Sequence, residues 1–286
     1  MSISFGHICP IPHLEDFVKG RKFHLVLAHL IEQSEDYTSF YRQESENGAT
    51  IIMDNSAYEM FYQGKEMFPA DKLLELATKV KADYIVLPDY PNEPMIKTIH
   101  AAKEYAPIFK EAGFKTFFVP QSQSGMIYDL CSSLFLAFNN NKDPSGTPFA
   151  DYVGLSCIGV PNGYGVLNQR IGRYLARSRF LEWELVSVII KTMRDSGIKI
   201  HFLGMSDGPR EISLVRRFAH LIDSWDSSTA IWHGLNGIHY DSSPTGLING
   251  KISEPVDFFK KFDSNVFGIV KRNMEYIDRK CVEVVI

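Results

Sequence analysis

Ile222-Asp-Ser-Trp-Asp-Ser-Ser-Thr-Ala230 is the stretch from which the organisation of this chain can be inferred. It follows an apolar run, 218–222, that we predict to be a buried strand. The chain leaves that strand through two acids, Asp223 and Asp226, and a group of small hydroxyl residues. In a barrel of alternating strands and helices, the carboxyl ends of the strands carry the chemistry. The stretch therefore predicts either a functional carboxylate at Asp226 or an ordinary turn, because Asp and Ser are also common turn residues.

Outward from this stretch, short apolar runs alternate with segments of helical periodicity. Six further runs are predicted to be strands: 23–29, 50–53, 83–87, 115–119, 151–155 and 199–203. Helices are predicted between them, for example over 69–80 and 93–112. This alternation is typical of a parallel sheet covered by helices, so we predict an α/β fold, a (β/α)8 TIM barrel in one domain over residues 1–286. An open doubly wound sheet is the alternative, although no G-x-G-x-x-G follows a strand.

Other segments are predicted from their composition, by their glycine, proline and polar content. They are a short helix at 14–21, a loop with some helix at 32–48, a polar loop at 139–146, a glycine-rich loop at 161–165, an irregular region at 230–252, a last helix at 255–276 and a short strand at 281–286.

The composition favours a protein of the reducing cytoplasm. The net charge is -4, so no overall basic character marks a nucleic-acid binder. The 4 cysteines lie far apart without a C-x-x-C pair, which argues against a cysteine-rich zinc site. The start of the chain does not resemble a signal peptide, and no apolar run reaches the ~20 residues of a membrane span. We expect no metal, no cofactor and no membrane partner.

Six predicted strands end in polar or small residues that would converge on one mouth of a barrel: Asp54, Asp89, Gln121, Gly154, Gly204 and Asp226. Each alone is explained equally well by a turn, a helix cap or a packing glycine, so the convergence carries the prediction. The carboxylate of Asp89 and the amide of Gln121 can together bind the donor and acceptor edge of a planar heterocycle. Tyr58 offers a flat face for stacking, and Met205 offers an adaptable apolar cover.

Two carboxylates of this set remain for chemistry. Asp54 and Asp226 suit reaction at an anomeric carbon, because glycosidic exchange with retention uses one nucleophile and one acid/base group. Glycine at 154 would let backbone groups approach the edge of the ligand. The histidines at 7, 29, 201 and 220 are expected to be structural, since a lone histidine is weak evidence for a metal site.

Six segments resemble, in chain order, motifs of the queuine/archaeosine tRNA-guanine transglycosylases. They are Met53-Asp-Asn-Ser-Ala-Tyr-Glu59 (D-S-G-G-F/Y-Q in that family), Leu87-Pro-Asp-Tyr-Pro91 (F-D-E-C-x-P), Val119-Pro-Gln121 (V-Q-G-G), Tyr152-Val-Gly-Leu-Ser156 (G-G-L-A), Phe202-Leu-Gly-Met-Ser-Asp-Gly-Pro209 (Y-L-M-G-V-G-x-P) and Ile222-Asp-Ser-Trp-Asp-Ser227 (I-D-M-F-D-C).

The resemblance implies a TIM barrel that exchanges guanine for a 7-deazaguanine base. It implies that Asp226 is the nucleophile and Asp54 the general acid/base. It assigns the remaining pocket residues to substrate binding: Asp89, Gln121, Gly154, Leu155, Asn55 and Gly204 hold the base, while Tyr58 and Met205 enclose it.

The chain also departs from that family. The zinc-binding C-x-C-x-x-C with a later His is missing, so the zinc-binding subdomain is not expected, and Ser56 and Ala57 replace two glycines. The chain is similar in these respects to the short, phage-type branch (DpdA), which inserts a 7-deazaguanine such as preQ0 into DNA. The expected partners are DNA, with tRNA as the alternative, and the free 7-deazaguanine base; a phage-encoded protein would act in the host cytoplasm.

Basic residues are expected to form the nucleic-acid surface. Arg170, Arg173 and Arg177 share one face of a predicted helix, although a basic helix face is equally well explained by solvation. A second basic group comprises Lys260, Lys261, Lys271, Arg272, Arg279 and Lys280. Two other functional classes stay open: a small-molecule lyase or isomerase that uses Asp54 and Asp226 as acid and base, and an inactive nucleic-acid-binding barrel.

Overall fold

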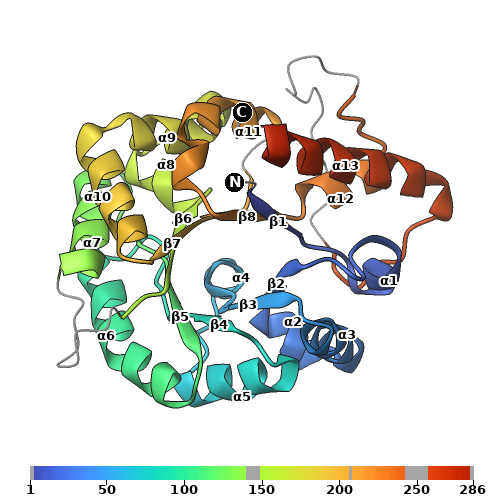
Figure 1. Cartoon of the computed structure of the whole chain (residues 1–286), viewed down its shortest axis with the longest axis horizontal. Helices are drawn as coiled ribbons and strands as arrows, with labels where there is room; N and C mark the ends of the chain where they lie inside the picture. Colours follow the sequence, from blue (N-terminus) through green and yellow to red (C-terminus); the bar gives the residue numbers. More distant parts are fainter. Residues whose placement is uncertain (1–2, 140–148, 206–207, 242–256, 284–286) are drawn as a thin grey trace.

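The computed structural model describes residues 3–139, 149–205, 208–241 and 257–283. At its centre, eight parallel strands form one sheet in the order β1-β8-β7-β6-β5-β4-β3-β2. The strands are β1 (Ser4–His7), β2 (Phe23–Leu27), β3 (Thr50–Asp54), β4 (Tyr84–Val86), β5 (Lys115–Phe118), β6 (Tyr152–Ser156), β7 (Lys199–Leu203) and β8 (Ser224–Ser227). β1 and β2 lie side by side, so the sheet is a nearly closed barrel (Figure 1).

Glycine makes this closure possible. At Gly6 an added Cβ would lie only 3.3 Å from the backbone N of Leu25 and equally close to the ring of Phe23. Real Cβ atoms seldom come so near, so β1 approaches β2 at a position without a side chain. The predicted (β/α)8 TIM barrel is confirmed.

Helices surround the barrel, and their amphipathic patterns explain why they pack there. The main ones are α2 (Ala28–Gln33), α3 (Glu35–Glu46), α5 (Ala70–Val80), α6 (Met95–Glu111), α7 (Ile127–Asn139), α9 (Arg170–Glu182), α10 (Glu184–Asp195), α11 (Arg210–Val215), α12 (Thr229–Leu235) and α13 (Phe267–Glu283). In α5 the residues Leu73, Leu76, Ala77 and Val80 are fully buried, at the spacing of one helix face. Each such leucine contributes about 1.5–3 kcal/mol of burial free energy.

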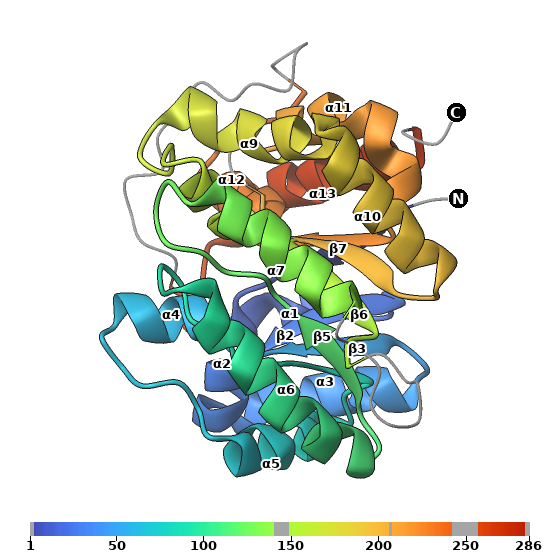
Figure 2. The ribbon, with the colours of Figure 1, turned by 90° about the vertical axis from the view of Figure 1, so that its left-hand side faces the viewer.

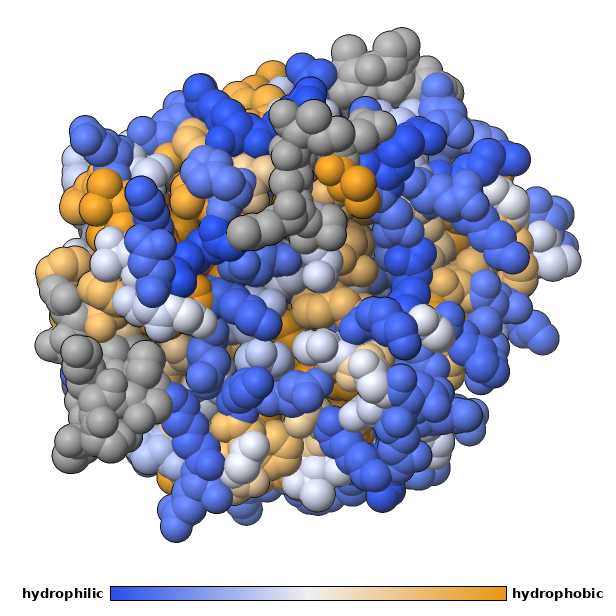
Figure 3. Space-filling view, in the orientation of Figure 1, coloured by the Kyte–Doolittle hydropathy of each residue, from blue (hydrophilic) through white to orange (hydrophobic). Residues whose placement is uncertain are grey.

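Three further helices are short. α1 (Leu14–Phe17) precedes β2, α4 (Ala57–Tyr62) follows β3, and α8 (Gly159–Gly163) follows β6. α4 appears in the middle of the barrel when the molecule is seen along its axis (Figure 1), and beyond one end of the sheet in the perpendicular view (Figure 2). It therefore lies over the mouth at which β3 ends. Hydrophilic side chains cover most of the face seen in Figure 3, and the hydrophobic ones form small patches between them.

The predicted strand at 218–222 is wrong, because the strand lies further along the chain. Residues Arg216–Leu221 form a 3-10 helix, and β8 comprises the polar stretch Ser224–Ser227. The strand begins after Asp223, whose carboxylate accepts hydrogen bonds from the Ile200 backbone N (2.8 Å) and from Arg194 (2.8 Å). Asp226 is thus a strand residue, and it pairs with Gly6 of β1.

Several other predictions are corrected. The 32–48 segment is mostly helical, 161–165 begins within α8, and 230–235 belongs to α12. Residues 281–283 end α13 and do not form a strand, and the helix predicted from 255 is regular only from Phe267, after a 3-10 turn at Ser264–Val266. β1 was not predicted, because four residues with one glycine carry little strand pattern. Most of the loop predicted at 139–146 and part of the irregular region at 230–252 lie outside the described residues. None of the helices in the described part of the chain has the length and apolar character needed to cross a membrane.

Candidate active site

A cavity of about 270 Å³ opens at the carboxyl ends of the strands. This volume is near the lower limit of small-molecule sites, which occupy roughly 300–1,000 Å³. Every strand or its following loop contributes to the lining: Ile8, Leu25, Leu27, Asp54, Asn55, Asp89, Pro91, Val119, Gln121, Ser156, Cys157, Leu203, Gly204, Met205, Asp226 and Ser227. α4 adds Ala57, Tyr58 and Glu59. Five of the six predicted strand-end residues, Asp54, Asp89, Gln121, Gly204 and Asp226, therefore line one cavity, and Gly154 does not.

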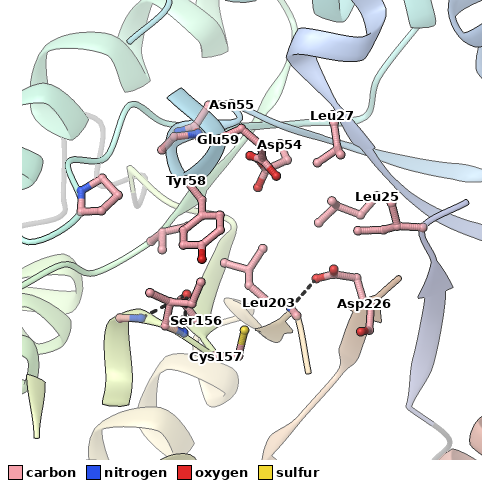
Figure 4. A pocket seen from close by; sticks show the side chains of 18 of the residues that line it. Leu25, Leu27, Asp54, Asn55, Tyr58, Glu59, Ser156, Cys157, Leu203 and Asp226 are labelled. Carbon is pink, nitrogen blue, oxygen red and sulfur yellow. Dashed lines mark hydrogen bonds between the residues drawn. The ribbon is translucent and has the colours of Figure 1, made fainter. Parts of the chain in front are cut away.

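Asp226 enters the cavity from β8 and is buried, with 3% of its surface exposed. Its Oδ1 accepts a hydrogen bond from the Gly204 backbone N (3.1 Å) and lies 2.8 Å from Nε2 of His201. Figure 4 shows the carboxylate of Asp226 and that of Asp54 reaching into the cavity from different sides. The two acids that the sequence assigns to chemistry thus face one space.

Asp54, at the end of β3, has the environment of a proton donor. Burial and the nearby Glu59 carboxylate raise its pKa well above the usual range. Its Oδ1 accepts a short hydrogen bond from the Ser56 backbone N (2.6 Å) in a turn where Ser56 has a left-handed φ of 59°. A carboxyl group whose pKa is raised in this way is suited to act as a general acid.

Glu59 is a carboxylate of the cavity to which the sequence analysis assigned no role. It lies on α4 beside Asp54, as Figure 4 shows, and lines the same cavity. Burial raises its pKa, and the carboxylates of Asp226 and Asp89 add to the shift. Its position in the first turn of a short helix gave no sequence signal, because it lies beyond the strand-end pattern.

Asp89 and Gln121 form the polar floor of the cavity, and both are buried. The Gln121 Nε2 donates to Oδ2 of Asp89 (2.6 Å), and the Asn55 Nδ2 donates to Oδ1 (2.7 Å). Burial raises the pKa of Asp89 to about 6, against the lowering effect of these two donors. At Gly159 an added Cβ would lie 3.3 Å from Oε1 of Gln121, so glycine leaves room beside that oxygen.

Asn55 has a different role from the predicted one. Its Nδ2 also donates to the Leu87 carbonyl (2.7 Å), and its Oδ1 accepts from the Ala57 backbone N (2.8 Å). Although it lines the cavity, both ends of its amide bind protein groups. Asn55 therefore orients Asp89 and the start of α4.

Gly154 and Leu155 do not line the cavity, in contrast to the predicted base contacts. A Cβ at Gly154 would lie 2.5 Å from the Phe117 ring and 2.6 Å from a methyl of Leu203, so this glycine is a packing residue inside the barrel. The carbonyl of Leu155 accepts a hydrogen bond from Arg177 (3.1 Å). The next two residues of the chain, Ser156 and Cys157, occupy the wall instead.

Tyr58, Met205 and Gly204 line the cavity as predicted. Tyr58 is 41% exposed, and its ring lies 4.3 Å from that of Tyr62, so it presents an aromatic face at the mouth. Burial raises the pKa of the Cys157 thiol to about 12, which keeps it protonated and unsuited to nucleophilic attack.

The predicted arginine cluster does not lie on one outer face. Arg177 is fully buried, forms an ion pair with Glu211 (2.7 Å) and donates to the carbonyls of Leu203 (3.1 Å) and Gly204 (2.8 Å). Its guanidinium therefore holds the ends of β6 and β7 and cannot contact a nucleic acid. Arg170 is exposed and Arg173 is half-buried.

Within the described residues, no group of three or more His, Cys, Asp or Glu side chains is arranged to hold a metal ion. A comparison with protein-family models finds no match, and no curated protein matches the sequence.

Proposed function

We propose that this chain is a transglycosylase that replaces guanine in DNA with a free 7-deazaguanine such as preQ0, as its resemblance to that family implies. One observation carries the proposal: two carboxylates on separate strands, Asp54 and Asp226, share a small cavity with a buried carboxylate–amide pair, Asp89 and Gln121. The first pair suits chemistry at an anomeric carbon. The second pair suits the polar edge of a purine-like base.

In the first step, the guanine nucleotide leaves the base stack and enters the cavity, because its glycosidic bond cannot be reached inside a duplex. Oδ2 of Asp226 attacks C1′ and forms a glycosyl ester. The C1′–N9 bond breaks, its electron pair goes to the guanine, and the protonated Asp54 carboxyl supplies the proton that neutralises the leaving base. The raised pKa of Asp54 supports this assignment.

In the second step, a 7-deazaguanine occupies the same polar floor. Its N9 proton goes to the Asp54 carboxylate, N9 attacks C1′, and the C1′–Oδ2 bond breaks to restore the Asp226 carboxylate. Two inversions give overall retention. Asp89 and Gln121 bind the base in both steps, and Tyr58 stacks against it at the mouth.

The test is incorporation of labelled preQ0 into single-stranded DNA, duplex DNA and tRNA by the purified chain. We expect incorporation into DNA, and a loss of several orders of magnitude in Asp226→Ala, as for other removed nucleophiles. The matched control is Asp223→Asn, in the same stretch but bound to Arg194 outside the cavity, which should retain exchange.

The other outcomes distinguish the alternatives. Incorporation into tRNA alone would identify a tRNA-guanine transglycosylase. Nucleic-acid binding without exchange would identify an inactive barrel, and no affinity for either nucleic acid would favour a small-molecule enzyme. Unchanged exchange in Asp226→Ala would remove Asp226 from the chemistry.

A further inference from the structure

His201 lies inside the barrel, directly behind Asp226. It belongs to β7, is fully buried, and is paired in register with Ser224 of β8. The rings of Phe117 (5.4 Å) and Tyr152 (6.2 Å) surround it. Its Nε2 lies 2.8 Å from Oδ1 of Asp226, and its Nδ1 lies 2.7 Å from Oγ of Ser224. The sequence analysis predicts only a structural role for this histidine.

The hydrogen bonds form a buried chain that ends on the proposed nucleophile. Oγ of Ser224 lies 3.1 Å from the hydroxyl of Tyr152, which is the far end of the chain. Both hydroxyl groups can act as donor or acceptor. Two proton arrangements are therefore consistent with an ionised Asp226. In one, a neutral His201 accepts from Ser224; in the other, a doubly protonated His201 donates to it.

In both arrangements, Nε2 of His201 carries a hydrogen. A carboxylate can only accept hydrogen bonds, so Nε2 of His201 must carry the hydrogen that lies towards Oδ1 of Asp226. The Gly204 backbone N is the second donor to the same oxygen, at 3.1 Å. Gly204 has a left-handed φ of 64°, and an added Cβ would lie 2.7 Å from Sγ of Cys157, so glycine allows this backbone to turn its N–H towards Asp226.

We infer that His201 is the positioning residue of the nucleophile, an inference that rests on the proposed function. Its Nε2–H and the Gly204 N–H fix Oδ1 of Asp226, which leaves Oδ2 directed to the sugar. When Oδ2 forms its bond to C1′, Oδ1 becomes the ester carbonyl oxygen and can keep both donors. Ser224 and Tyr152 hold the imidazole in the required orientation. Hydrogen bonds of this kind hold the carboxylate in its attacking orientation before the reaction begins, so the entropy cost of aligning Oδ2 with C1′ is lowered.

The kinetic test compares two substitutions at one position. His201→Phe keeps a planar ring but removes the donor, and we expect covalent adduct formation on DNA to slow on the order of 10- to 100-fold, with the DNA Kd unchanged. His201→Gln restores an N–H near the Nε2 position and should recover to within several-fold of the unmodified protein. Equal rates in the two variants would overturn the inference. If His201 only filled space, replacing its ring by a hydrogen-bond donor would not restore the rate.

His24 provides the matched control. It is also a buried histidine on a barrel strand, but it contacts the Arg21 carbonyl (3.1 Å) and Glu44 (3.4 Å) and does not line the cavity. His24→Gln should lower the thermal midpoint of unfolding without changing the rate of adduct formation. A matching rate loss in His24→Gln would assign the effect of His201 to general destabilisation.

A spectroscopic measurement tests the hydrogen bond without catalysis. In protein labelled with ¹⁵N-histidine, the NMR signals of His201 should show a hydrogen on Nε2 and should shift in Asp226→Ala. A tautomer protonated only at Nδ1 would overturn the inference. If the unmodified protein neither exchanges bases nor forms an adduct, the proposed function fails, while this spectrum still decides whether His201 donates to Asp226.

Discussion

The ionisation of Asp89 is governed by its burial and by two hydrogen bonds. Both of its oxygens accept from neutral amides, those of Asn55 and Gln121, so its charge is stabilised by hydrogen bonds from groups without charge. The effect of burial is larger than that of these hydrogen bonds, and it raises the pKa of Asp89 to about 6. Ionising Asp89 therefore costs stability as the pH rises through about 6, since the folded state binds the proton more tightly than the unfolded state. The charged form is the better acceptor for a ring N–H and an exocyclic amine.

We predict that the affinity for free preQ0 rises between about pH 5 and pH 7, with a midpoint near the pKa of Asp89, about 6. In Asp89→Asn the pH dependence near this midpoint should be lost, and the affinity should fall about 10- to 100-fold at pH 7, because one acceptor becomes a donor. Calorimetric titration at several pH values measures both. Since Asp54 and Glu59 also have raised pKa values, Glu59→Gln is the control, and it should retain the midpoint near 6. An Asp89→Asn protein with an unchanged pH profile would contradict the assignment.

At the scale of elements, the sequence predicts strands well where they are apolar and poorly where they are polar. β2 to β7 are found within a few residues, because buried parallel strands are near-continuous apolar runs. β8 is misplaced for the opposite reason, whereas β1 is missed because its four residues carry little strand pattern. Ser224 and Asp226 on β8 face a polar network and a cavity, so the strand lacks an apolar pattern. Local strand rules thus fail where a strand turns polar side chains to the candidate site.

The position of each residue within its strand or helix decides which residues of the candidate site could be predicted. Strand-end acids and amides such as Asp89 and Gln121 stand out, because polar groups directly after an apolar run are visible in the sequence. Glu59 and His201 do not, since one lies on a short helix and the other within a strand. The roles that we propose for them depend on neighbours from other elements, as in the pairing of His201 on β7 with Ser224 on β8.

Gly154 provides a test of packing inside the barrel. We predict that Gly154→Ala lowers the free energy of unfolding by about 1–3 kcal/mol, because the new methyl would lie 2.5 Å from the Phe117 ring and 2.6 Å from Leu203. Urea denaturation measures the change. The control is Gly268→Ala in α13, where the nearest atom is 4.0 Å away and alanine is the better helix former; it should be neutral or stabilising by up to about 1 kcal/mol. Similar stability losses in both variants would argue against a specific clash at Gly154.

At the scale of the whole molecule, a net charge of -4 means that the proposed DNA binding would depend on where the cations lie. In this barrel the helices return from the cavity end of the sheet to the opposite end, so the first turns of helices are closest to the mouth. Arg170 begins α9 and Lys271 lies in the second turn of α13, and both are exposed. Lys260 and Lys261 follow Phe258, whose carbonyl accepts from the Ile11 backbone N just beyond the carboxyl end of β1.

These four cations, Arg170, Lys260, Lys261 and Lys271, are predicted to contact DNA phosphates around the mouth. Each phosphate contact contributes about 0.7–0.9 to the slope of log K against log salt concentration, because binding releases condensed counterions. Replacing all four by Gln should therefore lower the slope by about 3, measured by fluorescence anisotropy with single-stranded DNA over a range of salt concentrations. Arg279, in the last turns of α13 and at the other end of the barrel, is the control, and Arg279→Gln should leave the slope unchanged. If the fourfold variant kept the slope of the unmodified protein while Arg279→Gln lowered it, DNA would bind at the end of the barrel away from the cavity, and base exchange at Asp226 would be excluded.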